Sequence, residues 1–278
     1  MKSLKGFTSN VKTILSKPRI AWSLICYLGS KVCGGEAVRS IYGIDVTDFS
    51  GFSEYIASKE FVDEREYKFL TGCDFPEGPV FDVGANIGVI SLILARRFPD
   101  RVIHAFEPNP SSVRSLRKNI SQNQADNVIV RDVAVGAKQE KVLFDANPRD
   151  RGTARKVNEK SRHVRQVACV TLDSYVEEYG IEKVSLLKID VEGYEKEVIK
   201  GARRLLDEKR IGLVYFEICP ALARKAGFHP ASPAKILKQS GYVLNRITPN
   251  GGLENGGISE IPKVELENWV AISPEYRG

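Results

Sequence analysis

From Val80 onward, short apolar segments alternate with segments of helical periodicity, and this alternation constrains the fold more than any other feature. The segment VFDVG precedes a helical pattern that ends at Arg97, and VIHAFE precedes a second helical pattern over residues 110–123, which NVIVRDVAV follows. This order predicts parallel strands joined by helices that cover both faces of a sheet. The strands lack polar alternation, as is typical of strands buried on both sides. We therefore predict an α/β fold with a doubly wound, mostly parallel sheet.

The same pattern continues toward the C-terminus. We predict further strands at KVLFD, QVACVTL, SLLKID and GLVYFEI, which are residues 141–145, 166–172, 185–190 and 212–218. Two more strands, over residues 242–247 and 269–273, are expected to close the sheet as an antiparallel edge. Residues 1–75 lack this alternation and contain an amphipathic pattern over 54–70, which predicts an N-terminal helical cap or extension. The main domain is then residues 76–278.

Charge and composition limit the cellular locations that such a chain can occupy. It has 278 residues, 42% of them hydrophobic, which is enough for a large core. Residues 1–40 hold seven basic residues and one acidic residue, and their longest apolar run is about ten residues, short of the roughly 20 that cross a bilayer. Five scattered cysteines without a CxxC pair indicate reduced thiols. We expect a cytoplasmic protein whose basic start either packs on the domain or rests peripherally on an anionic membrane.

The turn after the first predicted strand, DVGANIG at residues 82–88, lies where open α/β sheets bind ligands. Gly84 can adopt backbone angles closed to other residues, and Gly88 allows the next helix to pack closely. Asn86 stands where a dinucleotide fingerprint has its second glycine, so the turn is not built for a pyrophosphate. S-adenosylmethionine has no phosphate and carries an ammonium group that Asp82 could bind. The turn therefore favours S-adenosylmethionine as the ligand.

An acidic residue at the end of the second predicted strand supports a nucleoside ligand. Glu107 comes 25 positions after Asp82 and 19 after Gly88, close to the spacing at which an acid accepts hydrogen bonds from ribose hydroxyls. After the third strand, Asp132 lies where an acid could contact adenine, and an ordinary strand-end acid is the equal alternative.

Three further carboxylates follow two later strands. Asp190 and Glu192 belong to KIDVEG, and Glu217 lies near the end of GLVYFEI. Neighbouring parallel strands end at one edge, so we expect these carboxylates to meet near the transferred methyl group. Removing a proton from an alcohol takes a base or a metal, and the cluster could serve either purpose, although we assign no metal ligand. The structural alternative is that Glu192 caps a helix and Glu217 pairs with a lysine; Lys188 is expected to face a helix.

Other polar groups are weaker candidates. His104 lies inside a strand and is expected in the core, His163 lies in a charged loop, and His229 could act as a base near neutral pH. Residues 149–165 hold seven basic and two acidic residues. This segment is either a solvated loop or a lid for an anionic acceptor such as a phosphorylated sugar.

Five segments together resemble the FkbM family of S-adenosylmethionine-dependent methyltransferases: VFDVGANIGVISL, AFEPNPSSVRSLRKNI, NVIVRDVAVG, VTLDSYVEEYGI and LLKIDVEGYEKEVIKGA. They occur in this order over about residues 78–220. The resemblance implies a Rossmann-like class I methyltransferase fold and O-methylation of hydroxyls on sugars, glycolipids or polyketides. It also implies that Asp82, Gly84, Asn86 and Glu107 line the cofactor, with KIDVEG beside it. Residues 1–75 and those after about 225 match no motif, so we expect them to select the acceptor.

Three alternatives belong to other functional classes. A NAD-dependent oxidoreductase would carry GxGxxG, which is absent. A nucleic-acid methyltransferase often has an Asn/Asp-Pro-Pro-aromatic tetrapeptide where this chain has DVEG, so we expect a small-molecule, glycan or lipid-linked acceptor and no nucleic acid. A non-catalytic nucleoside-binding or membrane-docking module would keep Asp82 and Glu107 and make no use of the acidic cluster.

Overall fold

The computed structural model describes residues 27, 30, 37–49, 62–146 and 163–276. The larger sheet contains β3 (Val80–Val83), β4 (Ile103–Phe106), β5 (Val128–Arg131), β9 (Val184–Ile189), β10 (Ile211–Ile218), β11 (Val243–Ile247), β12 (Leu253–Asn255) and β13 (Glu267–Ile272). The other strands are β1 (Arg39–Ile41), β2 (Ile44–Val46), β6 (Ala134–Val135), β7 (Glu140–Asp145) and β8 (Val164–Val170). The helices are α4 (Glu64–Gly72), α5 (Val89–Arg97), α6 (Pro110–Gln122), α7 (Leu172–Glu178), α8 (Glu195–Lys200), α9 (Arg203–Asp207), α10 (Pro220–Lys225) and α11 (Ser232–Gln239), with a 3-10 helix η3 (Ile261–Lys263).

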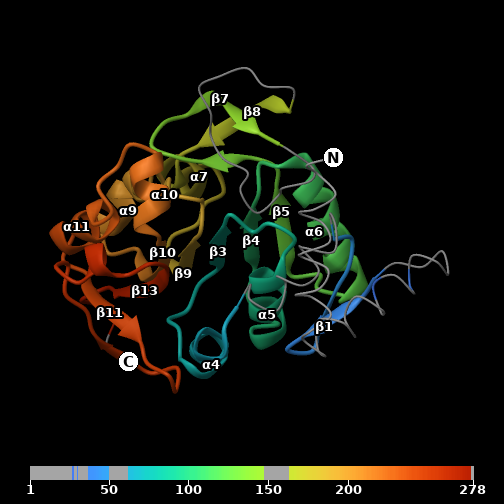
Figure 1. Ribbon diagram of the computed structural model, residues 1–278, viewed down its shortest axis with the longest axis horizontal. Coiled ribbons are helices and arrows are strands. Elements are labelled where there is room, and N and C mark those ends of the chain that lie inside the picture. The colour runs from blue at the N-terminus through green and yellow to red at the C-terminus, as the bar shows by residue number, and fades with distance from the viewer. Residues whose placement is uncertain (1–26, 28–29, 31–36, 50–61, 147–162, 277–278) are drawn as a thin grey trace, which may run out of the picture.

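Within the described residues, the larger sheet has eight strands in the order β12-β11-β13-β10-β9-β3-β4-β5. The five strands from β10 to β5 are parallel, whereas β13, β11 and β12 pair antiparallel at the other side. The chain adds β4 and β5 on one side of β3 and then β9 and β10 on the other (Figure 1). This confirms the predicted doubly wound sheet with an antiparallel edge. It also places the reversal of strand order between β3 and β9, the point at which such sheets bind ligands.

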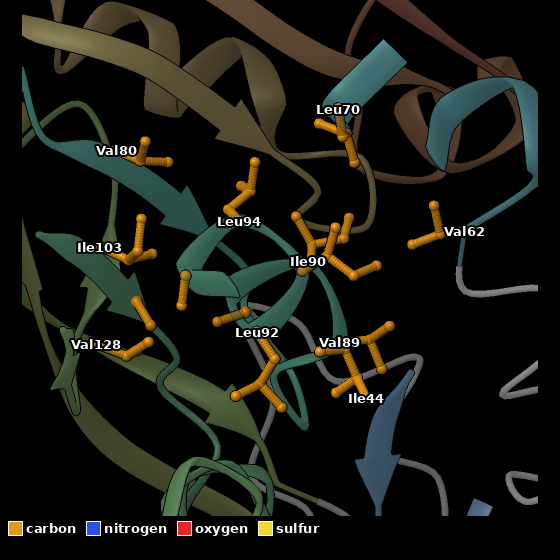
Figure 2. Close-up of a cluster of buried hydrophobic side chains, with 14 of the residues drawn as sticks. Ile44, Val62, Leu70, Val80, Val89, Ile90, Leu92, Leu94, Ile103 and Val128 are labelled. Atoms are coloured by element: carbon orange, nitrogen blue, oxygen red, sulfur yellow. The ribbon is translucent and has the colours of Figure 1, made fainter. Parts of the chain in front are cut away.

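The sheet separates two hydrophobic cores because successive side chains of a strand point to opposite faces. On β9, Leu186 belongs to the core that contains α5, and Leu187 belongs to the core under α8, α9 and α11. Helix α5 (VISLILARR) is buried along its whole apolar stretch. Figure 2 shows Ile90, Leu92 and Leu94 of α5 among side chains from the strands and from the N-terminal segment.

The described part of residues 1–75 contains a β-hairpin as well as a helix. β1 and β2 pair antiparallel, a feature that the sequence pattern did not predict. Helix α4 begins at Glu64 behind a capping box, in which the Asp63 carboxylate accepts from the Glu66 backbone N–H at 2.8 Å and Glu66 accepts in return from Asp63. Residues 54–61 of the predicted helix lie outside the described residues. Ile44, Val62 and Leu70 share the core of α5 (Figure 2), so this segment packs directly on the sheet domain.

The predicted segment NVIVRDVAV is divided between two sheets, because β5 joins the larger sheet and β6 joins a smaller one with β8 and β7. Strand β8 exposes Arg165 and Gln166 and buries only Cys169 fully. Such a strand suits a small sheet with one wet face better than a central position buried on both sides. The smaller sheet lies apart from the central strands at the top of Figure 1. No helix in the described ranges is long and apolar enough to span a bilayer.

Candidate active site

The turn between β3 and α5 depends on glycine at two positions. Gly84 has φ of +81°, and a Cβ atom there would lie 1.8 Å from the backbone oxygen of Asp190, so the turn contacts the end of β9 through the backbone. Gly88 has φ of +95°, and a Cβ atom would lie 2.4 Å from Leu116 Cδ1. The close packing expected of Gly88 is thus made against helix α6. Asn86 also has a positive φ, +50°, which asparagine tolerates better than most residues.

Asp82 lies beneath this turn and is fully buried. Its Oδ1 atom lies 2.9 Å from Lys188 Nζ, and its Oδ2 atom accepts from the Ser91 hydroxyl at 2.6 Å. Lys188 Nζ also donates to the carbonyl oxygen of Gly84 at 2.8 Å. Asp82 therefore supports the turn from below and does not line either cavity described here. The geometry fits indirect positioning of the ligand better than the direct ammonium contact expected from the sequence.

Lys188 does not face a helix as the sequence pattern suggested. Its side chain is buried and reaches over the end of β3, where it contacts Asp82 and lies 3.8 Å from Asp190 Oδ2. Burial lowers the pKa of Lys188, but the nearby Asp82 and Asp190 carboxylates outweigh it, so that the pKa is raised overall. The ammonium group therefore stays charged. A lone lysine within the apolar run SLLKID was the available sequence signal for this role.

Glu107 follows β4 and lines the first cavity. Its two carboxylate oxygens accept the backbone N–H groups of Asn86 and Asn109, each at 2.8 Å. A carboxylate oxygen can accept two hydrogen bonds, so one acceptor site remains on each. Burial raises the pKa of Glu107 to about 7, against the opposing effect of these backbone hydrogen bonds. The residue is thus held rigidly with capacity for ligand hydroxyls.

The first cavity has a volume of about 410 Å³ and lies between the β3–α5 turn and the smaller sheet. Gly84, Asn86 and Glu107 form one side, residues 133–138 another, and the turn of Asp190 to Glu192 a third. Apolar side chains of Phe106, Val142 and Phe144 also line it. Such a cavity, mostly apolar with a few convergent polar groups, is typical of small-ligand sites.

A second cavity, of about 340 Å³, adjoins the first. Both are lined by Gly84, Asn86, Asp190 and Glu192, and the second alone is lined by Glu217. The expected meeting of Asp190, Glu192 and Glu217 is therefore found at one edge of the sheet. The remaining walls come from Asp63, Arg65 and Glu66 before and within α4 and from Leu266, Glu267 and Asn268 at β13.

Asp132 lies apart from both cavities. Its half-exposed carboxylate pairs with Arg117 at 2.6 Å, whereas its neighbours from Val133 onward line the first cavity. This arrangement corresponds to the ordinary strand-end acid named as the alternative. Cofactor contact by Asp132 is thus not supported by its position.

A family model described as the methyltransferase FkbM domain matches residues 82–244, more than half of the chain. The chain belongs to the FkbM methyltransferase family. This confirms the expected methyl transfer with S-adenosylmethionine as the donor, and the strand order of the larger sheet confirms the expected class of fold. The matched range contains the candidate residues of the β3–α5 turn and the carboxylates Asp190, Glu192 and Glu217.

Three relatives of this FkbM methyltransferase show how far the similarity extends. Methyltransferase 1 from Beauveria bassiana is 24% identical and covers 71% of this chain and 87% of its own length. Methyltransferase sdnD from Sordaria araneosa is 28% identical, covering 62% of this chain and 77% of its own. Hexuronic acid methyltransferase AglP from Haloferax volcanii is 29% identical, with 58% of this chain and 62% of its own length covered.

The remaining candidates of the FkbM methyltransferase lie elsewhere. His104 is a core residue, as expected: its Nδ1 atom lies 2.8 Å from the Tyr175 hydroxyl, and burial lowers the pKa of its ring to about 4. His229 caps a local turn through the Ala231 N–H and lines neither cavity. Among the described residues, no group of three or more potential ligands has the geometry of a metal site. The basic segment is outside the described residues except for its end, 163–165.

Sequence reasoning missed the wall of the second cavity that α4 and β13 supply. Glu66 is buried there, and its Oε1 atom accepts from the Asn268 side-chain amide. Nothing in the spacing of residues 63–66 and 266–268 indicates that they meet. The sequence signal was indirect: both segments fall in the parts of the chain where acceptor selection was expected.

Proposed function

We propose that this chain transfers a methyl group from S-adenosylmethionine to a hydroxyl oxygen of a small-molecule or glycan acceptor. One observation carries the proposal: the first cavity, with Glu107, and the second, with Glu217, meet at Gly84, Asn86, Asp190 and Glu192. A donor and an acceptor held in adjoining cavities can approach each other at that junction. Relatives named for a hexuronic acid and for 31-O-demethyl-FK506 support an acceptor that bears hydroxyl groups.

The residues present fit the adenosine part of the donor. Glu107 retains acceptor capacity for the ribose hydroxyls, and the apolar wall of the first cavity suits an adenine ring. The orphaned, buried Oδ1 atom of Asn86, which has no hydrogen-bond partner among the described residues, offers a further acceptor. In this proposal Gly84 and Gly88 shape the turn, and Asp82 holds it through Lys188.

The donor supplies a methyl group on a positively charged sulfur, and its transfer to an alcohol leaves a neutral thioether, a methyl ether and one proton. The chain must take up that proton, since an alcohol ionises far above neutral pH. Asp190, Glu192 and Glu217 lie where an acceptor hydroxyl would reach the junction. We assign the proton-accepting role to Glu217 and positioning roles to Asp190 and Glu192.

The domain division belongs to the same proposal. Residues 76–278 form the methyltransferase domain, and the segment before residue 76 contributes the α4 wall of the acceptor cavity, through Arg65 and Glu66. Acceptor selection should therefore change when Arg65 is replaced, while donor affinity is retained. Measurement of both affinities for Arg65→Ala separates these effects.

Transfer of tritium from labelled S-adenosylmethionine into fractions of a cell extract tests the proposed reaction. The labelled product should keep its methyl group after alkaline hydrolysis, because methyl ethers resist treatment that cleaves methyl esters. Donor binding without transfer to any fraction would instead favour the non-catalytic nucleoside-binding alternative. Binding of NAD in preference to S-adenosylmethionine would overturn the proposal.

Cytoplasmic location with peripheral membrane contact through residues 1–40 is a separate proposal. Most of this segment lies outside the described residues, so its support remains the excess of basic residues. Deletion of residues 1–36 should reduce sedimentation with vesicles that contain anionic lipid and leave neutral vesicles unaffected. Undiminished binding to the anionic vesicles after the deletion would contradict membrane contact through this segment.

A further inference from the structure

Glu217 stands beside a row of other carboxylates at the edge of the sheet. Its neighbour Phe216 is the register partner of Ile189, the last residue of β9. Asp190 directly follows Ile189, lines the same cavity as Glu217 and acts electrostatically on it. On the other side, Glu217 pairs in register with the uncharged Asn268 of β13. Glu192 lines the same cavity, and Glu195 of α8 also acts electrostatically on Glu217.

The cations of the second cavity are engaged by other groups. Lys188 Nζ lies 2.9 Å from Asp82 and donates to the Gly84 carbonyl oxygen. Arg65 donates to Asp63 at 2.8 Å and lies 3.9 Å from Glu267. Glu217 therefore shares its surroundings with several carboxylates and has no cation of its own among the residues facing it. The charged and polar residues that share this cavity with Glu217 or act electrostatically on it come from β9, the turn after it, α8, α4 and β13. They are Lys188, Asp190, Glu192, Glu195, Arg65, Glu66, Glu267 and Asn268.

Carboxylates crowded in this way cannot all ionise at neutral pH, because like charges in a partly desolvated site repel one another. Burial, followed by the charges of Asp190, Glu195 and Glu192, raises the pKa of Glu217 to about 9, and Lys188 only partly offsets the rise. Glu217 thus holds a proton when the site contains protein groups alone.

We propose that Glu217 loses this proton when the cationic methyl donor binds, so that the donor itself converts Glu217 into the base. This inference rests on the proposed function. The positive sulfur of S-adenosylmethionine would supply the charge that the protein does not place beside Glu217. S-adenosylhomocysteine has a neutral sulfur and the same adenosine and amino-acid parts, so it would leave Glu217 protonated.

The consequence is an ordered use of one carboxyl group. Glu217 is ionised while the donor is bound, and it can then accept the proton of an acceptor hydroxyl. Once the sulfur is neutral, Glu217 keeps that proton without opposing charge. Exchange of product for fresh donor then releases the proton to solvent.

The experiment is titration calorimetry of the full chain at pH 7 in buffers that differ in ionisation enthalpy, with S-adenosylmethionine and S-adenosylhomocysteine as ligands. We expect the donor to release about one proton more than the product. Sinefungin, which carries a protonated amine near the position of the methyl group, should behave like the donor. In Glu217→Gln the difference between ligands should disappear, whereas in Glu107→Gln it should persist, since both ligands contact Glu107 alike.

Equal proton release with both ligands in the unmodified protein would overturn the inference and leave the proposed function intact. Persistence of the difference in Glu217→Gln would overturn the assignment to this residue. Failure of S-adenosylmethionine to bind at all would overturn both. If Glu217→Gln does not fold, the affinities of the two ligands for the unmodified protein are compared between pH 6 and 7.5. The ratio of donor affinity to product affinity should rise about tenfold per pH unit. A ratio that does not change with pH contradicts the inference.

Discussion

Lys188 Nζ lies 2.9 Å from Asp82 Oδ1 in an ion pair that leaves only 3% of the lysine side chain and none of the aspartate exposed. The same ammonium group donates to the carbonyl oxygen of Gly84, so it connects the ends of β3 and β9 to the turn above them. The ion pair thus lies directly beneath the junction of the two cavities. Its loss would disturb both the stability of the sheet and the shape of the turn.

Lys188→Met should therefore be strongly destabilising, because it leaves the Asp82 carboxylate buried without a cation. We expect a loss of about 3–5 kcal/mol in the free energy of unfolding, measured by urea denaturation. The double variant Asp82→Asn with Lys188→Met should recover part of the loss. Lys200→Met, which removes a half-exposed pair with Glu197, should change stability by less than about 1 kcal/mol. Equal effects of the two single variants would contradict the structural role of Lys188.

Glu107→Gln and Asp132→Asn form a matched comparison of two strand-end acids. The first should weaken binding of S-adenosylhomocysteine by about 1–3 kcal/mol, because a good acceptor of ribose hydrogen bonds is lost. The second should leave affinity unchanged, since Asp132 pairs with Arg117 and lines neither cavity. Calorimetry measures both. A large effect of Asp132→Asn would restore the adenine contact expected from the sequence.

Gly84→Ala tests the close approach of the turn to β9. The added Cβ atom would meet the Asp190 backbone oxygen at 1.8 Å, and φ of +81° is itself unfavourable for alanine. Gly180→Ala is the control, because Gly180 has φ of +63° and no atom within 4 Å of the added Cβ. The control should cost about 1–2 kcal/mol, and Gly84→Ala should cost more and abolish donor binding. Retained donor binding in Gly84→Ala would show that the turn tolerates displacement.

Glu217→Gln should stabilise the protein at alkaline pH. The folded state raises the pKa of Glu217 from its ordinary value of 4.5 to about 9, so this carboxyl group opposes folding progressively as pH rises through that interval. We expect the variant and the unmodified protein to have similar stability at pH 4.5 and the variant to gain about 5 kcal/mol by pH 8.5. Urea denaturation at both pH values measures the change. Glu178→Gln, a substitution at an exposed position, is the control and should show no such dependence on pH. An effect of Glu217→Gln that does not change with pH would contradict the protonation of Glu217 in the folded state.

Much of the fold was predictable because its determinants are local. The apolar strands from VFDVG to GLVYFEI and the helices between them are encoded in short segments, and connection rules then require a parallel sheet. The smaller sheet was harder to predict, since β7 and β8 look like strands in either sheet. The exposure of Arg165 and Gln166 shows that β8 belongs to the smaller sheet, but this exposure is known only once the neighbouring strands are known.

For the site, the sequence by itself determined which polar residues end neighbouring strands, and so brought Gly84, Asn86, Glu107, Asp190 and Glu217 to one edge. The tertiary structure decided what each of them contacts. It paired Asp82 with Lys188, placed Asp132 outside the cavities, and completed the second cavity with residues from α4 and β13. The physical reason is that strand ends follow from local periodicity and topology, whereas charge pairing and cavity walls depend on side chains that approach from distant parts of the chain.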